Sequence, residues 1–399
     1  MRKLIRFGLD QNLVALIYLL LSILIASIAV GINIIAFPAV LISHDVAALQ
    51  IGFSSTNEII FGVAMSFFLS QIVSRLTAMR TAFIIAIFYA LIVATIFFYQ
   101  NFYLWLLLSG LGGACWFSLF VIRQAWINHL IIDRNRSVIL ALTTTIFCFG
   151  FVIGSFLVKH FGALNHLSFL ISAGLILISV LMLFLIRKTQ PTKIDSQKIS
   201  FREFIAKEPK TSVARFLLDL QAGCLVCLGV VFGVKIGLSV ENAGFLIGAF
   251  MASGLFDLYA GFLVRDLNRS KLIMTGFLGC LSTMIFGLIF YKSYIALLAC
   301  FFFFGASCAL IMVATLTIIN ESFAKEKLVA ANATFQAIGS CGSVLGCFAG
   351  GIFIDLFDFY GFFAIIIMAN LLYFIYILFG PEARNKRHKH SYGKNKIVN

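Results

Sequence analysis

The sequence predicts an all-α integral membrane protein with 12 transmembrane helices in two six-helix bundles. The first observation is composition: 61% of the 399 residues are hydrophobic and only 12% are charged, whereas soluble proteins carry roughly 25% charged residues. The second is a succession of twelve apolar stretches, each near the 20 or so residues that one crossing requires. The third is a single long polar connection, at 188–211, that divides them six and six.

The twelve expected spans follow one another closely along the chain. Because the first begins about ten residues in and leads directly into a second, we expect no cleaved signal peptide. The expected ranges are 12–37, 52–73, 81–99, 102–127, 138–158, 166–187, 212–236, 242–264, 271–291, 294–319, 328–352 and 360–380.

The net charge of +14 does not indicate a nucleic-acid-binding protein, because the cations sit between apolar blocks instead of on one compact face. Cytoplasmic loops are enriched in lysine and arginine, and the segments that would lie outside hold only Lys159, Lys235 and Lys292. Both termini are therefore expected in the cytoplasm. The expected domains are the N-terminal bundle 1–187, the cytoplasmic linker 188–211, the C-terminal bundle 212–382 and a basic tail 383–399.

The linker contains a helix signal. Residues 200–203 read SFRE, the pattern of a capping box, and Phe201, Phe204 and Ile205 would then share one helical face. We expect a short amphipathic helix along the cytoplasmic membrane surface, with an unstructured linker as the alternative.

Motifs for enzymes and cofactors are missing from the sequence. It contains no Walker-type phosphate loop, no zinc-binding HExxH pattern and no serine nucleophile elbow. The nine cysteines all fall in apolar stretches, which favours packing over disulfides, and this includes the pair Cys224 and Cys227. The tail histidines are more consistent with a solvated segment near anionic lipid headgroups than with a metal site. We therefore expect no enzyme activity, no cofactor and no metal.

Several segments resemble motifs of the major facilitator superfamily. Residues 261–271 read GFLVRDLNRSK and resemble that family's Gly-x-Leu-x-Asp-Arg-x-Gly-Arg-Arg loop, while the corresponding first copy, 70–80, keeps only Arg75 and Arg80. Residues 106–113, LLLSGLGG, resemble its Arg-x-x-x-Gly-x-Gly segment with Leu106 at the arginine position. The segment 126–136 resembles a bacterial branch of the family.

The resemblance implies a bacterial inner-membrane secondary transporter that moves a small organic solute by alternating access, coupled to protons and working as a monomer. A transporter-like receptor that moves nothing is the alternative, favoured by the departures at Ser70, Ser74 and Leu106. Charged residues in the short loops would gate the cytoplasmic side as helix ends meet and separate, or would only anchor the loops. These candidates are Arg75, Arg80, Gly261, Arg265, Asp266, Arg269, Lys271 and Glu321.

Polar residues inside the spans are candidates for the substrate cavity, because charge and polarity within a bilayer are costly. In the family, spans one, four, seven and ten line that cavity. Arg123 in span four could bind an anionic substrate, pair with Glu321, or extend to the interface. The cavity candidates are the polar residues Asn33, Arg123, Gln124, Gln221, Asn320 and Gln336, together with Phe37, which follows Asn33 in span one.

Three carboxyl groups lie within the spans. Asp219 and Asp257 are the candidates for proton coupling, although a fixed salt bridge with Arg215, one turn earlier, is the alternative for Asp219. Glu58 ends the segment 55–58, STNE, which reads as a capping box at the start of span two. We therefore assign Glu58 a structural role.

Overall fold

The computed structural model describes residues 11–98, 101–130, 136–191, 200–324 and 327–379. Within these ranges twelve helical segments are long and apolar enough to cross a membrane, and no strand occurs. The predicted all-α membrane fold with twelve spans is therefore confirmed. The tail 383–399 lies outside the described residues.

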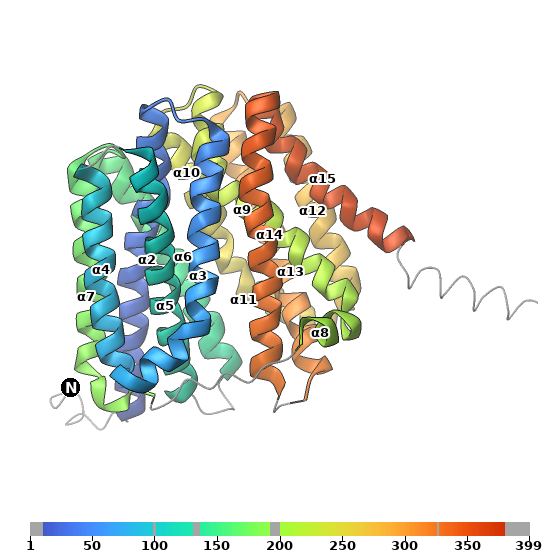
Figure 1. Cartoon of the computed structure of the whole chain (residues 1–399). Coiled ribbons are helices and arrows are strands. Elements are labelled where there is room, and N and C mark those ends of the chain that lie inside the picture. The colour runs from blue at the N-terminus through green and yellow to red at the C-terminus, as the bar shows by residue number, and fades with distance from the viewer. Residues whose placement is uncertain (1–10, 99–100, 131–135, 192–199, 325–326, 380–399) are drawn as a thin grey trace, which may run out of the picture.

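The N-terminal half forms a six-helix bundle, shown in blue to green in Figure 1. Helix α2 packs against α6 and α7, α3 packs against α5, and α4 packs against both α5 and α7. The helices are α2 (Gln11–Ser43), α3 (Ala48–Leu76), α4 (Ala78–Phe98), α5 (Phe102–Leu130), α6 (Arg136–Phe161) and α7 (His166–Leu185).

The C-terminal half repeats this arrangement with six further spans, of which the second is interrupted. There, α10 and α11 are joined by a short 3₁₀ turn, η3, a feature that often marks a hinge or a strained stretch within a helix. The elements are α9 (Pro209–Lys235), α10 (Val240–Ala252), η3 (Ser253–Leu255), α11 (Phe256–Asp266), α12 (Arg269–Ile289), α13 (Tyr294–Ser322), α14 (Leu328–Phe357) and α15 (Phe359–Phe379).

The molecule has two ends, which we call the linker face and the opposite face. The linker face is the end where η2 (Arg187–Thr189) and α8 (Phe201–Lys207) lie, at the bottom of Figure 1. The opposite face carries the α2–α3 and α9–α10 turns, at the top of Figure 1.

The short helix α8 is held against the C-terminal half. Phe204 is fully buried and stacks on Phe323 with ring centroids 5.3 Å apart, and Lys327 pairs with Glu203 at 3.0 Å. The side chain of Ser200 makes no capping hydrogen bond, so the predicted capping box is not formed. Glu203 instead pairs with Lys327, the residue directly before α14, and does not reach back to the start of α8.

The two halves meet through α3 against α14 and α6 against α10. On the opposite face the contact is close because glycine occupies the crossing: a methyl group at Gly351 would lie 2.7 Å from the Leu49 Cα. Both carboxylate oxygens of Asp355 on α14 accept backbone N–H groups from the first turn of α3, from Ala48 at 3.1 Å and Leu49 at 2.9 Å.

The second contact between the halves, α6 against α10, also lies near the opposite face. The Phe156 and Phe245 rings are 4.8 Å apart, and the Lys159 ammonium lies 4.7 Å from the Phe245 ring centre. A cation over an aromatic face is attractive when it is partly removed from water. These contacts hold the halves together at the opposite face. Toward the linker face, a methyl group at Gly261 on α11 would meet nothing within 4 Å.

Candidate functional site

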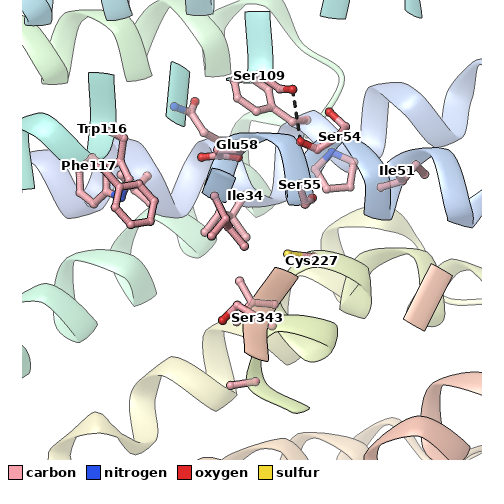
Figure 2. A pocket seen from close by; sticks show the side chains of 18 of the residues that line it. Ile34, Ile51, Ser54, Ser55, Glu58, Ser109, Trp116, Phe117, Cys227 and Ser343 are labelled. Atoms are coloured by element: carbon pink, nitrogen blue, oxygen red, sulfur yellow. Dashed lines mark hydrogen bonds between the residues drawn. The ribbon is translucent and has the colours of Figure 1, made fainter. Parts of the chain in front are cut away.

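A cavity of about 360 Å³ lies between the two halves, in the size range of small-molecule sites. Helices α2, α3, α4 and α5 form one wall, and α9, α10 and α14 form the other. Figure 2 shows it from close by. The lining residues are Val30, Asn33, Ile34, Phe37, Pro38, Leu41, Ile51, Ser54, Ser55, Glu58, Ile59, Tyr89, Ser109, Trp116, Phe117, Ala222, Gly223, Val226, Cys227, Phe250, Met251 and Ser343.

The N-terminal wall carries most of the polar groups. Asn33 donates a hydrogen bond from Nδ2 to the Tyr89 hydroxyl at 3.4 Å, and its buried Oδ1 has no partner among the described residues. Ser109 donates to the Ser54 carbonyl at 3.3 Å, the dashed contact in Figure 2. This wall therefore offers hydrogen-bonding groups to a polar part of a ligand.

Glu58 lies in this wall, and its carboxylate makes no hydrogen bond or ion pair with the described residues. Helix α3 begins at Ala48, so Glu58 lies about three turns inside the helix. The expectation that residues 55–58 cap this helix is wrong. The N–H groups at the true helix start donate to Gln50 and to Asp355 of the other half.

Glycine on α5 brings Glu58 to the cavity. A methyl group at Gly113 would lie 2.6 Å from the Glu58 side-chain Cγ, and one at Gly110 would lie 2.7 Å from the Asn57 amide nitrogen. Helix α3 can approach α5 this closely only because these positions lack side chains. The glycine-rich segment 106–113 thus sets the depth of the carboxylate in the site.

The C-terminal wall is nearly apolar. Its polar members are Ser343, which donates to the Asp219 carbonyl at 3.3 Å, and the thiol of Cys227, whose sulfur lies 2.7 Å from that of Cys347. All nine cysteines are free. The thiols at this crossing of α9 and α14 pack where small side chains are needed, as the sequence predicted.

A second cavity, of about 320 Å³, lies next to the first on its linker-face side. The two share Trp116 and Phe117, and the remaining α5 residues of the second follow along that helix toward Leu130. Its lining residues are Ile23, Ala26, Trp116, Phe117, Phe120, Arg123, Gln124, Thr143, Thr144 and Phe147.

Four of the seven predicted cavity residues line one of these cavities: Asn33 and Phe37 the first, Arg123 and Gln124 the second. Arg123 donates hydrogen bonds to Ser22 and Ser179, so its suggested pairing with Glu321 is wrong.

The other three predicted cavity residues lie elsewhere. Gln221 is fully buried and accepts a hydrogen bond from Asn370 of α15 at 2.8 Å, because its side of α9 faces the bundle interior. Asn320 accepts from Asn332 at 3.3 Å, and Gln336 accepts from Arg215 at 2.8 Å. None of the three lines either cavity.

The two aspartates predicted for proton coupling have different surroundings. Asp219 pairs with Arg215 at 2.7 Å, and Arg215 also contacts Met312 and lies over the Phe335 ring at 4.8 Å. Asp257 is half-buried in the first turn of α11 and forms no ion pair within the described part of the chain. Neither lines either of these two cavities.

The predicted gating residues gather on the linker face. Arg269 pairs with Glu321 at 2.7 Å, and because both belong to the C-terminal half this pair does not join the halves. Gly261 faces open space. The others are exposed: Arg75, Arg80, Arg265, Asp266 and Lys271.

The arrangement defines a class of protein: a multi-pass membrane transporter whose two helical halves enclose a central cavity. The sequence matches the family model of the Major Facilitator Superfamily over residues 19–234 and again over 211–397. The chain belongs to this family of secondary transporters, as the sequence motifs indicated.

Individual relatives agree with this assignment. An uncharacterized MFS-type transporter of Bacillus subtilis (strain 168), YfkF, is 27% identical over 288 residues, 69% of this chain and 70% of that protein. The solved structure of the nucleoside transporter NupG covers 92% of this chain and 98% of its own, with a TM-score of 0.76 and 14% identity. A bacterial homolog of the human lysosomal transporter Spinster, inward-facing and unoccupied, covers 92% and 97%, with a TM-score of 0.75 and 12% identity. At these identities the two structures show a shared fold.

Proposed function

We propose that this chain transports a small organic solute across the bacterial inner membrane by alternating access, with proton coupling. The observation that carries the proposal is the central cavity between the halves, with close contacts between α3 and α14 on one side of it. A solute bound there would be released when the halves rock about it, as in other transporters with a site at the middle of the membrane.

The proposed orientation has the linker face in the cytoplasm, because the linker and the short loops beside it carry the cations. The cavity would then be reached from the cytoplasm, which corresponds to the inward-facing conformation described for the Spinster homolog. An alkaline phosphatase fusion at residues 162–165 should be active and one in the linker inactive; the reverse pattern would contradict this orientation.

Proton coupling is proposed to use a carboxyl group within the spans. Glu58 joins Asp219 and Asp257 as a candidate, and it is the carboxyl that lines the central cavity without a counter-ion. A group that faces the solute can couple its own protonation to solute binding directly. Asp219 would first have to leave Arg215.

The experiment begins with a thermal-shift screen of the purified protein against metabolite classes, since a ligand that binds the native state raises its melting temperature. Accumulation of the solute identified in this way is then measured in proteoliposomes with and without a pH gradient. We expect Glu58→Gln to abolish gradient-driven accumulation while exchange of solute at equal pH continues.

The matched control is Glu241→Gln, which removes a carboxylate from the first turn of α10, away from the cavity. Gradient-driven accumulation that survives Glu58→Gln but is lost in Asp219→Asn or Asp257→Asn would move the coupling site to that aspartate. Accumulation unaffected by all three substitutions would remove the coupling proposal. A solute that binds but never crosses the membrane would favour a receptor, the alternative to which Leu106 and the reduced loop motif at Ser70 and Ser74 point.

A further inference from the structure

The second cavity contains a buried cation with no anionic partner. Arg123 is 3% exposed, and its guanidinium donates from Nε to the Ser22 hydroxyl at 3.1 Å and from Nη2 to the Ser179 hydroxyl at 2.8 Å. Among the described residues no carboxylate contacts it. Two neutral hydroxyls orient the guanidinium but leave its charge uncompensated.

An uncompensated charge within a membrane-spanning bundle is costly, so such groups usually serve a ligand or ion pathway. Ser179 donates its own hydrogen to the Ile176 carbonyl at 2.6 Å, which leaves its oxygen lone pairs directed to Arg123. With helices α2 and α7 fixing two of its nitrogens, the third, Nη1, has no partner in the described chain.

The rest of this cavity is apolar and aromatic. Trp116, Phe117, Phe120 and Phe147 supply ring surfaces, while Gln124 and Thr143 supply further polar groups. An apolar pocket with one well-placed charged group is typical of sites that bind the apolar body of a small ligand and orient it by its polar head. The planar donors of arginine match the oxygens of a carboxylate or phosphate.

We propose that Arg123 binds the anionic head of the transported solute, and that this solute is an organic monoanion with an apolar body, such as an aromatic carboxylate. The inference rests on the proposed transport function and adds the substrate class. The head lies at Arg123 and the body lies against Trp116 and Phe117, which line both the second cavity and the central cavity.

The carboxyl of Glu58 lines the central cavity, whereas Arg123 lies in the second cavity. Glu58 contacts α5 at Gly113, and Arg123 follows ten residues later on the same helix, about 15 Å along its axis. Glu58 is therefore not part of the proposed head site at Arg123.

The test uses three probes of matched shape: benzoate, neutral benzamide and cationic benzylamine, compared at constant ionic strength on the purified full-length protein. Thermal shift and quenching of tryptophan fluorescence report binding, because Trp116 lines both cavities. We expect benzoate to bind more tightly than benzamide and benzylamine. In Arg123→Gln its Kd should rise about 10- to 100-fold, the range for a hydrogen bond to a charged group.

Arg123→Lys keeps the charge without the planar fork and should bind benzoate with intermediate affinity, which keeps the test informative if Arg123→Gln folds poorly. The matched control is Arg187→Gln, which removes an exposed arginine from the same half and should bind benzoate as the unaltered protein does.

Three results would overturn the proposal. Benzamide or benzylamine could bind as tightly as benzoate, benzoate could bind Arg123→Gln as tightly as the unaltered protein, or benzoate could fail to bind at millimolar concentration. Failure of the transport proposal is distinguishable. In that case benzoate would still bind through Arg123, but labelled benzoate would not exchange across proteoliposome membranes. If benzoate does not bind through Arg123 but a solute found in the screen still exchanges across the membrane, the transport proposal stands.

Discussion

At the scale of single residues, the glycines of α5 decide how the central cavity is built. Gly110 and Gly113 let α3 approach until Asn57 donates to the Leu106 carbonyl at 2.6 Å and Glu58 lies in the wall of the cavity. In a membrane the association of helices depends on such close packing, since lipid tails are as apolar as the side chains they replace.

Gly113→Ala should lower the stability of the protein. The added methyl group would overlap the backbone of Glu58, 2.6 Å from its carbonyl carbon, and backbone cannot move aside as a side chain can. We expect a loss of about 1–3 kcal/mol, as for other overpacked sites, read as a lower melting temperature in detergent.

Gly174→Ala is the control, because a methyl group there would meet nothing within 4 Å and alanine favours a helix over glycine. Its melting temperature should be equal or higher. Equal melting temperatures for both variants would mean that α3 and α5 are not packed as closely as the structure has them.

Residue-scale features of the site were only partly readable from sequence. Asn33, Arg123 and Gln124 stand out in the sequence as polar groups inside apolar spans, and Phe37 follows Asn33 by about one helical turn. Gln221 stands out equally, but α9 is surrounded by other helices, and a sequence does not tell which side of such a helix meets the cavity. Glu58 was assigned a structural role because STNE imitates a helix start, whereas the true start is set by Asp355, some three hundred residues later.

At the scale of elements, the first turn of α3 is held to the other half by a carboxylate. Asp355 of α14 accepts two of the N–H groups that every helix leaves unpaired at its N-terminus. A carboxylate is also favoured there by the helix dipole. This contact stabilises the state in which the opposite face is closed.

Asp355→Asn should shift the protein toward the state open at the opposite face. Asparagine keeps one acceptor oxygen but places an NH2 donor against the second N–H group. One hydrogen bond to a charged group is then lost, worth about 1.5–3 kcal/mol, which changes the ratio of the two states about 10- to 150-fold. The measurement is the rate at which a membrane-impermeant thiol reagent, applied from the opposite face, labels Ser343→Cys in the cavity wall, read at that residue by peptide mass spectrometry.

The matched control is Asp358→Asn, three residues later. It removes the same charge from the same face, but Asp358 pairs with Lys235 of its own half in an exposed ion pair, 2.9 Å apart, worth about 0–1 kcal/mol. Its labelling rate should not change. If both variants raise the labelling rate equally, the effect comes from net charge at this face and not from the contact between α14 and α3.

At the scale of the whole molecule, the number of spans and the two-bundle fold were predictable, because hydropathy is a local property and twelve stretches each have the length of a crossing. The loop motifs indicated the family, and the match of the family model to residues 19–234 and 211–397 confirms it. The arrangement of the two cavities was not predictable, since each wall combines residues from several spans whose rotation depends on packing. The orientation and the gating loops remain predictions.

The central claim is that the halves move as two bodies about the cavity. It is tested most directly by measuring two distances in one population, using spin labels on a ketone-bearing amino acid so that the native cysteines stay in place. One pair, at Ser74 and Ala333, spans the halves on the linker face, and the other, at Gln50 and Leu356, spans them on the opposite face; all four positions are exposed. We predict a second state in which the first distance shortens as the second lengthens, with Asp355→Asn increasing its population. A single distance for each pair, unchanged by Asp355→Asn and by every solute that binds, would contradict alternating access in this protein.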